Sequence, residues 1–492
     1  MKMWSGRFRQ PLDTQFERWQ RSFDFDRRLL KYELAASTAH ARALKNAGIV
    51  SAQELICILE GLQQIGELAA TSKGFIEDDE AEDVHHFVEK QLVARIGEVG
   101  YKLHSGRSRN EQIATDLRLY VRAAIDQLRS DLVEACSVFV ERAEQAGGAA
   151  MPAYTHLQHA EPVLVAHWLL AYVEMFSRDA DRLADCRKRL NVCPLGSGAV
   201  AGATLPLDRA FMAGELGFTG PTANSVDATS DRDFVLEFVN ALSLLGLHLS
   251  RWAEEMIIFS AQEFGFVELP EAYSTGSSAM PQKKNPDLLE LVRGKSGRVV
   301  GCATALMVAM KGLPLAYNKD LQETQEPLFD ATDAALGMLP LVAGWMKAVE
   351  FDHERMSAAA QSGFMNAWAA ATYLVKRSVP SRLAHEQIGK AVKLCVEKRC
   401  ELQDLKLEEL RTLNSLFDES FYECLKPASV LAIHDVVGGT AAARVRDGIA
   451  AARKKIESLR SESVRSESPQ IESPHIEPAR VESANEEVHA HS

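Results

Sequence analysis

Apolar residues recur at three- and four-residue spacing over long windows of the chain, whereas strand-like alternation is scarce. The pattern predicts an all-α protein. Its clearest window starts at Ser108, where Glu111 three residues later completes a capping-box signature. The apolar stripe that follows runs to Gly147. We therefore expect one long helix over residues 108–147.

Three further long helices are expected over residues 162–191, 230–264 and 285–312. The first begins at Pro162, because proline favours the first turn of a helix. The second has Ser230 as its cap and is apolar nearly all round, which is typical of a helix buried inside a bundle. Helices of this length predict an extended bundle rather than a globule of short elements.

The expected division of the chain has three helical domains and a tail. Residues 1–105 and 356–460 also read as helical, but with more interruptions than the central bundle over 106–355. In residues 461–492 glutamate recurs every five positions and prolines interrupt any helix, so this segment is predicted to be a disordered acidic tail.

Charge and cysteine usage narrow the class of protein. The 492 residues include 55 Lys and Arg against 68 Asp and Glu, a net charge of −13 that argues against nucleic acid or an anionic membrane as the main partner. No signal or transit peptide is visible, and the most apolar stretch, Phe238–Ser250, is too short to span a bilayer. The eight cysteines form no CxxC pair, which indicates reduced thiols in a cytoplasmic protein.

A polar loop precedes each of the long helices, at residues 104–110, 154–161, 224–233 and 274–286. Helix N-termini present free N–H groups and a partial positive charge, which suit anions. The loops add the cationic residues Arg107, Arg109, Arg232, Lys283 and Lys284. Each loop alone reads as an ordinary capped helix start, but the four together indicate a small substrate with several carboxylates.

The length of the helices has a consequence for the site. If the first two long helices pack antiparallel, the loops at Arg109 and His156 lie tens of ångströms apart within one chain. They share a site only if another subunit brings them together. The sequence therefore predicts a homo-oligomer with composite sites.

Other chemistries fit less well. The glycine-rich run at residues 194–203 matches GxGxxA but has no helix directly after it, so a dinucleotide site is discounted. A di-iron bundle needs repeated Glu-x-x-His motifs, and the body of the chain offers Glu82 to His85 alone. His156 and His159 have the spacing of metal ligands, but no carboxylate or cysteine cluster completes them.

Several motifs resemble those of the argininosuccinate lyase family within the fumarase/aspartase superfamily. The superfamily signature GSxxMxxKxN is matched by Gly276, Ser277, Met280, Lys283 and Asn285. The motifs WSGRF, KLHSGRSRN, YTHLQ, PLGSGAVAG, DATSDRDF and KGLPLAYNKDLQE also match, and together they extend from Trp4 to about Gly439.

The resemblance implies three helical domains whose central bundle forms the core of a homotetramer with active sites shared between subunits. It implies a reversible elimination that converts argininosuccinate to L-arginine and fumarate, the last step of arginine biosynthesis. No cofactor and no metal is implied.

The resemblance also implies roles for individual residues. Ser277 is the expected base, with Lys283 stabilising its alkoxide, and His156, oriented by Glu290, helps to protonate the leaving nitrogen. The implied substrate-binding residues are Ser22, Asp26, Ser108, Arg109, Asn110, Thr155, Arg232, Asn285, Tyr317 and Gln322.

Two positions depart from the family pattern, and two rival functions stay open. Gln325 stands where relatives often have lysine, and Glu161 replaces the usual glutamine after YTHLQ. The first rival is another lyase of the superfamily, such as adenylosuccinate lyase, which needs a nucleotide-phosphate pocket. The second is a non-catalytic relative, because this fold also serves as a lens crystallin.

Overall fold

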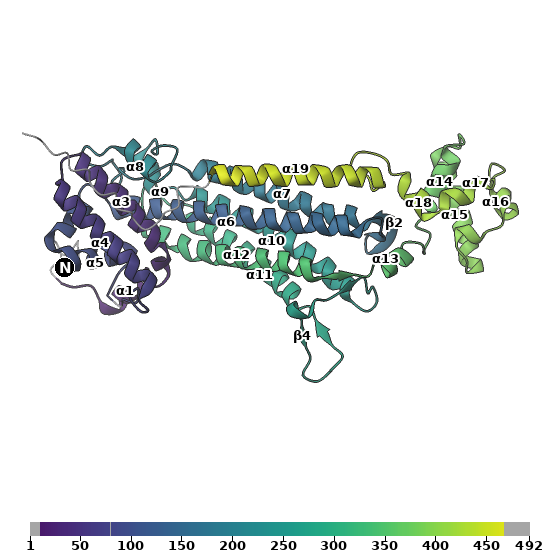
Figure 1. Ribbon diagram of the computed structural model, residues 1–492, viewed down its shortest axis with the longest axis horizontal. Helices are drawn as coiled ribbons and strands as arrows, with labels where there is room; N and C mark the ends of the chain where they lie inside the picture. Colours follow the sequence, from purple (N-terminus) through teal and green to yellow (C-terminus); the bar gives the residue numbers. More distant parts are fainter. Residues whose placement is uncertain (1–9, 79, 467–492) are drawn as a thin grey trace, which may run out of the picture.

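The computed structural model describes residues 10–78 and 80–466, and it confirms the all-α prediction (Figure 1). The molecule is elongated. The helices of the first hundred residues lie at one end, the long helices run side by side through the middle, and a small group of helices forms the other end. The WSGRF motif and residues 467–492 of the expected tail lie outside the described residues.

The N-terminal end is built from short and medium helices. They are α1 (Thr14–Trp19), α2 (Phe23–Asp26), α3 (Leu30–Asn46), α4 (Ala52–Thr71), α5 (Val84–Ile96) and a 3-10 helix over Gly97–His104. Phe23 stacks on Phe87 with ring centroids 5.0 Å apart, which ties α2 to α5. The side chain of Asp83 caps α5 by accepting from the backbone N–H of His86.

The central bundle is formed by long helices. They are α6 (Arg109–Ala146), α7 (Val165–Leu190), α10 (Asp233–Ser260), α11 (Asp287–Met310), α12 (Gln325–Ala348) and α19 (Ala442–Ser466). Their apolar faces share one core with the N-terminal helices, and within it the rings of Trp252 and Trp345 meet edge-on with centroids 5.2 Å apart. Burying such large aromatic side chains is a main source of stability for the bundle.

Helix α10 is, among the described helices, the one long and apolar enough to cross a membrane by length and composition. The central helix of a water-exposed bundle passes the same test. Its residues Phe238, Leu242 and Trp252 are buried where it packs against α7, α11 and α12.

Two predicted helix starts are wrong. Residues 150–164 form a hairpin of β1 (Ala150–Thr155) and β2 (Gln158–Leu164), so α7 begins three residues after Pro162. Pro162 pairs with Pro152 across this hairpin, where neither residue has an N–H to donate. Ser230 is the last residue of α9 (Ser225–Ser230), and α10 begins at Asp233 instead.

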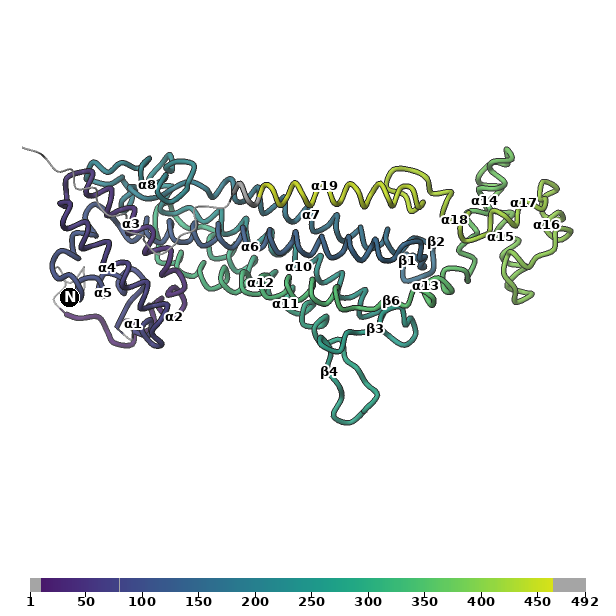
Figure 2. The backbone as a smooth tube through the Cα atoms, in the orientation of Figure 1, coloured from purple at the N-terminus to yellow at the C-terminus, as the bar shows by residue number. Residues whose placement is uncertain are grey.

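Short elements connect the long helices. Helix α8 spans Arg209–Glu215, α13 spans His353–Ala359, and β3 (Val267–Glu268) pairs with β6 (Glu350–Phe351). Strands β4 (Thr275–Gly276) and β5 (Lys284–Asn285) pair at the base of an arm that projects from the bundle (Figure 2).

The C-terminal end has its own core. Helices α14 (Ala367–Val375), α15 (Ser381–Lys398), α16 (Leu407–Leu413) and α17 (Ser420–Leu425) surround a cluster that includes Tyr373, Phe417 and Phe421. Helix α18 (Pro427–Ala432) follows α17 and contacts β2. Helix α19 then returns along α6 and α7. The structure thus differs from the expected division, because residues 442–460 pack on the bundle and residues 461–466 continue α19 rather than starting the tail.

Candidate functional site

The start of α6 carries three of the predicted substrate-binding residues. Ser108 caps the helix, since its Oγ accepts a hydrogen bond from the backbone N–H of Asn110 at 3.3 Å. The backbone N–H of Ser108 in turn donates to Glu111 Oε1 at 3.1 Å. Arg109 is the first helical residue. The predicted capping box is therefore confirmed, and it fixes the backbone from which Arg109 and Asn110 project.

Arg109 faces two acidic residues at the start of α5. Its Nη1 lies 3.1 Å from Asp83 Oδ2 and 3.5 Å from Glu82 Oε2. These contacts hold the guanidinium in place while leaving about a quarter of the side chain exposed. An Arg pinned in this way is preorganised for a carboxylate.

Ser22 and Asp26 lie buried beside the same helix start. Asp26 Oδ2 accepts from Ser22 Oγ at 2.6 Å, and Oδ1 accepts from the backbone N–H of Val84 at 3.0 Å. Burial and the nearby Asp83 raise the pKa of Asp26 to about 7. In this structure the two residues support the N-terminus of α5.

Tyr317, Arg232 and Gln322 complete the group at this end of the bundle. Burial lowers the pKa of Arg232 to about 10, and its nearest ionisable neighbours include Tyr317. Tyr317 in turn interacts electrostatically with Arg232, Asp83 and Arg109. Gln322 Nε2 donates to the carbonyl of Gln20 at 3.2 Å.

The structure therefore gathers most of the predicted substrate-binding residues in one region. They are Ser22, Asp26, Ser108, Arg109, Asn110, Arg232, Tyr317 and Gln322.

Thr155 and His156 lie at the opposite end of α6. They stand at the tip of the β1–β2 hairpin, where His156 and Leu157 both have positive φ angles, 58° and 57°. Two successive left-handed residues are typical of a tight two-residue hairpin turn but unfavourable for side chains of this size. The turn leaves His156 exposed, in a conformation that the hairpin imposes.

Ser277 lies on the projecting arm, directly after β4. Its Oγ accepts from the backbone N–H groups of Ala279 at 3.2 Å and Met280 at 3.1 Å. Two donors directed at one hydroxyl oxygen favour negative charge on that oxygen. Lys283 lies exposed in the same loop.

Asn285 and Glu290 flank the start of α11. Asn285 Nδ2 donates to Thr275 Oγ1 at 3.4 Å, which ties β5 to β4. Glu290 is exposed and lies 4.0 Å from Arg293 on the same helix. The expected contact of Glu290 with His156 stays a prediction.

Within one chain the candidate residues thus form separate groups. The 38 residues of α6 span about 57 Å at about 1.5 Å per residue, and they lie between the group at Arg109 and the hairpin at His156. The Ser277 arm projects from the side of the bundle between those ends.

Sequence reasoning missed the acidic partners of Arg109 and the role of the glycine-rich loop. Glu111 Oε2 accepts from the backbone N–H of Gly198 at 2.8 Å, and Asn110 Nδ2 donates to the carbonyl of Ala199 at 3.2 Å. The loop at residues 194–203 therefore packs against the first turn of α6. The signal that was available for the acidic partners is the adjacent pair Glu82–Asp83 before a helix.

The two positions that depart from the family pattern have local partners. Glu161 Oε1 lies 3.4 Å from His434 Nε2, which joins β2 to the segment before α19. Gln325 is buried at the start of α12.

The comparisons with known proteins agree with this architecture. A family profile described as "Lyase" matches residues 6–301, and one described as "Argininosuccinate lyase C-terminal" matches residues 364–432, the part with its own core. Among solved structures, EDDS lyase in complex with formate superposes with a TM-score of 0.83 at 25% identity, covering 93% of each chain. A class II fumarase from Schistosoma mansoni shares the fold, with a TM-score of 0.70 at 17% identity over 81% of this chain and 90% of its own.

Two sequence relatives have a higher identity to this chain than these solved structures do. An argininosuccinate lyase of Koribacter versatilis (strain Ellin345) is 59% identical over 456 residues, 93% of this chain and 98% of the relative. One of Acidobacterium capsulatum is 58% identical over 464 residues, 93% of this chain and 96% of the relative. Since both family profiles, the relatives over nearly their full length and the fold agree, the chain belongs to the argininosuccinate lyase family.

Proposed function

We propose that the chain is a carbon–nitrogen lyase that converts argininosuccinate to L-arginine and fumarate, reversibly, in arginine biosynthesis. Relatives named argininosuccinate lyase at 47–59% identity support this reaction. The structural observation that carries the site assignment is the pair of backbone N–H groups directed at Ser277 Oγ.

The reaction begins with removal of a weakly acidic proton next to a carboxylate. Serine is a poor base unless its alkoxide is stabilised. The N–H groups of Ala279 and Met280, with Lys283 in the same loop, provide that stabilisation. The alkoxide of Ser277 takes the carbon-bound proton, and the electron pair moves into the carboxylate to form an aci-carboxylate dianion.

The carbon–nitrogen bond then breaks. The electron pair of the dianion forms the double bond of fumarate, while the guanidinium nitrogen of arginine leaves and takes up a proton. His156, oriented by Glu290, provides that proton directly or through a water molecule. Arg109, Asn110, Ser108, Thr155 and Asn285 hold the carboxylates of the fumarate portion.

The arginine portion binds at the N-terminal end of the bundle. Tyr317, Gln322, Ser22 and Asp26 are its proposed contacts, and Arg232 adds positive charge near Tyr317. Because Asp26 is engaged with Ser22 and Val84 in this structure, its contact with the amino group of the substrate requires exchange of a hydrogen bond.

One chain does not bring these groups together, so the proposed enzyme is a homotetramer with sites shared between subunits. Apolar side chains exposed on the bundle helices support this assembly: Leu244, Leu247, Leu291, Val300, Met307, Val308 and Leu341. Several large apolar side chains exposed on long helices are typical of a protein–protein interface. The free thiols of all eight cysteines fit a reducing cytoplasm.

The experiment is an assay of fumarate release from argininosuccinate, with adenylosuccinate as the competing substrate. We expect turnover of argininosuccinate, and loss of about 10²- to 10⁴-fold in kcat in Ser277→Ala. The matched control is Ser278→Ala, the exposed neighbour in the same loop, which keeps kcat.

Turnover of adenylosuccinate instead would overturn the substrate assignment. Undiminished kcat in Ser277→Ala would overturn the assignment of the base. No turnover of either substrate by a correctly assembled protein would favour the non-catalytic alternative.

A further inference from the structure

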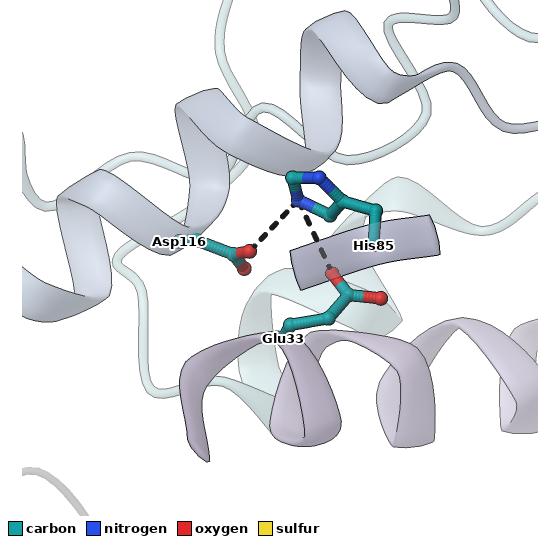
Figure 3. A group of neighbouring side chains, drawn as sticks. All are labelled: Glu33, His85 and Asp116. Atoms are coloured by element: carbon teal, nitrogen blue, oxygen red, sulfur yellow. Dashed lines mark hydrogen bonds and ion pairs between the residues drawn. The ribbon is translucent and has the colours of Figure 1, made fainter. Parts of the chain in front are cut away.

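Three ionisable side chains meet in the interior behind the start of α6 (Figure 3). His85 Nε2 on α5 lies 3.1 Å from Asp116 Oδ2 on α6 and 3.7 Å from Glu33 Oε2 on α3. One donor atom from each residue lies within 4.8 Å of the other two. All three side chains are buried, and they come from three different helices.

The oxygen atoms around His85 are incompletely satisfied. Within the described residues, Glu33 Oε2, Asp116 Oδ1 and Gln112 Oε1 are buried without a hydrogen-bond partner. Gln112 reaches the same place because its Nε2 donates to Glu33 Oε1 at 3.0 Å. A buried oxygen without a donor is unfavourable, and a bound cation would satisfy several such oxygens at once.

A small cavity adjoins these atoms. Its volume is about 10 Å³, room for one water-sized group, and its lining includes Glu33, His85 and Gln112. A water in this cavity would contact Glu33, His85 and Gln112, and Arg107 and Arg109 also line the cavity.

The charges nearby leave an excess of negative charge when His85 is neutral. Four carboxylates face two guanidinium groups, and these are Asp26, Glu33, Asp83, Asp116, Arg107 and Arg109. Arg107 Nη2 lies 3.7 Å from Glu33 Oε1, whereas Glu33 Oε2 faces His85 and has no hydrogen bond among the described residues.

We propose that Glu33, His85 and Asp116 bind one divalent first-row transition ion, with Gln112 Oε1 or a water in the cavity completing its coordination. One imidazole nitrogen with carboxylate and amide oxygens is a donor set suited to Zn²⁺, Co²⁺ or Mn²⁺. The site is structural. The ion joins α3 and α5 to the first turns of α6, behind Arg109, and takes no part in the elimination.

The test uses the full-length chain, unfolded in the presence of a chelator and refolded with or without Zn²⁺. We expect about one Zn²⁺ per chain after dialysis, as a structural site requires, and a higher Tm in the zinc-loaded protein. With Co²⁺ as the probe, visible d–d bands stronger than those of the aqua ion report a bound ion of low coordination number. His85→Asn lowers the bound metal at least about tenfold.

The matched control is His248→Asn. His248 Nδ1 lies 2.6 Å from Asp179 on the bundle, a histidine–carboxylate pair outside the cluster, so this variant keeps the metal. A wild-type chain that refolds without bound Zn²⁺ and without Co²⁺ bands would overturn the proposal and leave a proton on His85 as the occupant. Equal metal content in wild type and His85→Asn would also overturn it. If His85→Asn fails to fold, the Co²⁺ spectrum of the wild type decides.

Discussion

Glu111 Oε2 accepts a hydrogen bond from the backbone N–H of Gly198 at 2.8 Å, while Glu111 Oε1 accepts from the N–H of Ser108 at 3.1 Å. One buried carboxylate therefore caps α6 and holds the glycine-rich loop against it. The position of Arg109 depends on both contacts, because it lies between the cap and Glu111 in the first turn.

The glycine-rich loop is expected to tolerate no side chain at Gly198. Its φ is +60°, and a Cβ there would stand 2.7 Å from the carbonyl oxygen of Gly202. Gly198→Ala should lower the free energy of unfolding by more than about 1 kcal/mol and raise KM, because the strained loop withdraws from Asn110 and Glu111. Urea denaturation and steady-state kinetics measure the two effects.

Gly148→Ala is the matched control for that substitution. A Cβ at Gly148 meets open space and its φ is not in the left-handed region, so the change in stability should stay within about 0.5 kcal/mol. Equal losses in the two variants would contradict the role assigned to the loop.

Arg109→Lys tests the contacts that Arg109 Nη1 makes with Asp83 and Glu82. Lysine keeps the charge but cannot hold two acidic groups and a substrate carboxylate in one plane. We expect kcat/KM to fall by roughly 10- to 100-fold, the equivalent of about 1.5–3 kcal/mol for one charged hydrogen bond. The control is Arg444→Lys, an exposed ion pair at the start of α19, which leaves kcat/KM unchanged.

The bounds of a long helix were predicted well where the sequence has both a capping residue at the start and a glycine at the end. Ser108 with Glu111 marked the start of α6 and Gly147 its end, and the structure confirms both. The start of α7 was wrong because Pro162 suits a first helical turn and an edge strand equally well. Its pairing with Pro152 is a contact across the hairpin that periodicity within one segment does not reveal.

Motifs supplied the candidate site residues, whereas their geometry was not predictable. The sequence named Ser277, but the two N–H groups directed at its oxygen depend on how the arm turns. The left-handed backbone of His156 arises from the hairpin and has no signature in the residue types. His85 drew notice only through its spacing from Glu82, whereas its true partners, Glu33 and Asp116, lie on other helices.

The half-buried imidazole of His104 should make the free energy of unfolding depend on pH. Burial and the charges of Arg107 and Arg109 lower the pKa of His104 to about 4, against 6.5 for the free side chain. The unfolded chain therefore binds a proton at this position before the native protein does. The contribution to stability is present above pH 6.5 and is lost as the pH falls from 6.5 toward 4.

His104→Asn removes this contribution. Denaturation curves at pH 5 and pH 7.5 should show a smaller difference in unfolding free energy for the variant than for the wild type. A difference of the same size in both proteins would show that His104 is protonated equally in the folded and unfolded chains.

Mixed assemblies test whether the sites are shared between subunits. His156→Asn and Ser277→Ala are each expected to be inactive alone, since each removes one group of the proposed mechanism. If a site takes Ser277 from one subunit and His156 from another, random 1:1 mixing restores about a quarter of the sites, because each position is intact with a probability of one half. Fumarate release after joint dissociation and reassembly measures the recovery.

The matched control mixes Ser277→Ala with Lys283→Ala. Both residues lie in the loop of the same arm. Every arm in this mixture therefore carries one of the two substitutions, whichever chain supplies it. Mixing should restore no activity. Recovery in the first mixture alone therefore identifies sites that combine the arm of one subunit with the hairpin of another. No recovery in the first mixture would place Ser277 and His156 in the same chain's site and would require the arm to fold back along α6. Recovery in both mixtures would contradict the assignment of Ser277 and Lys283 to one arm of the same site.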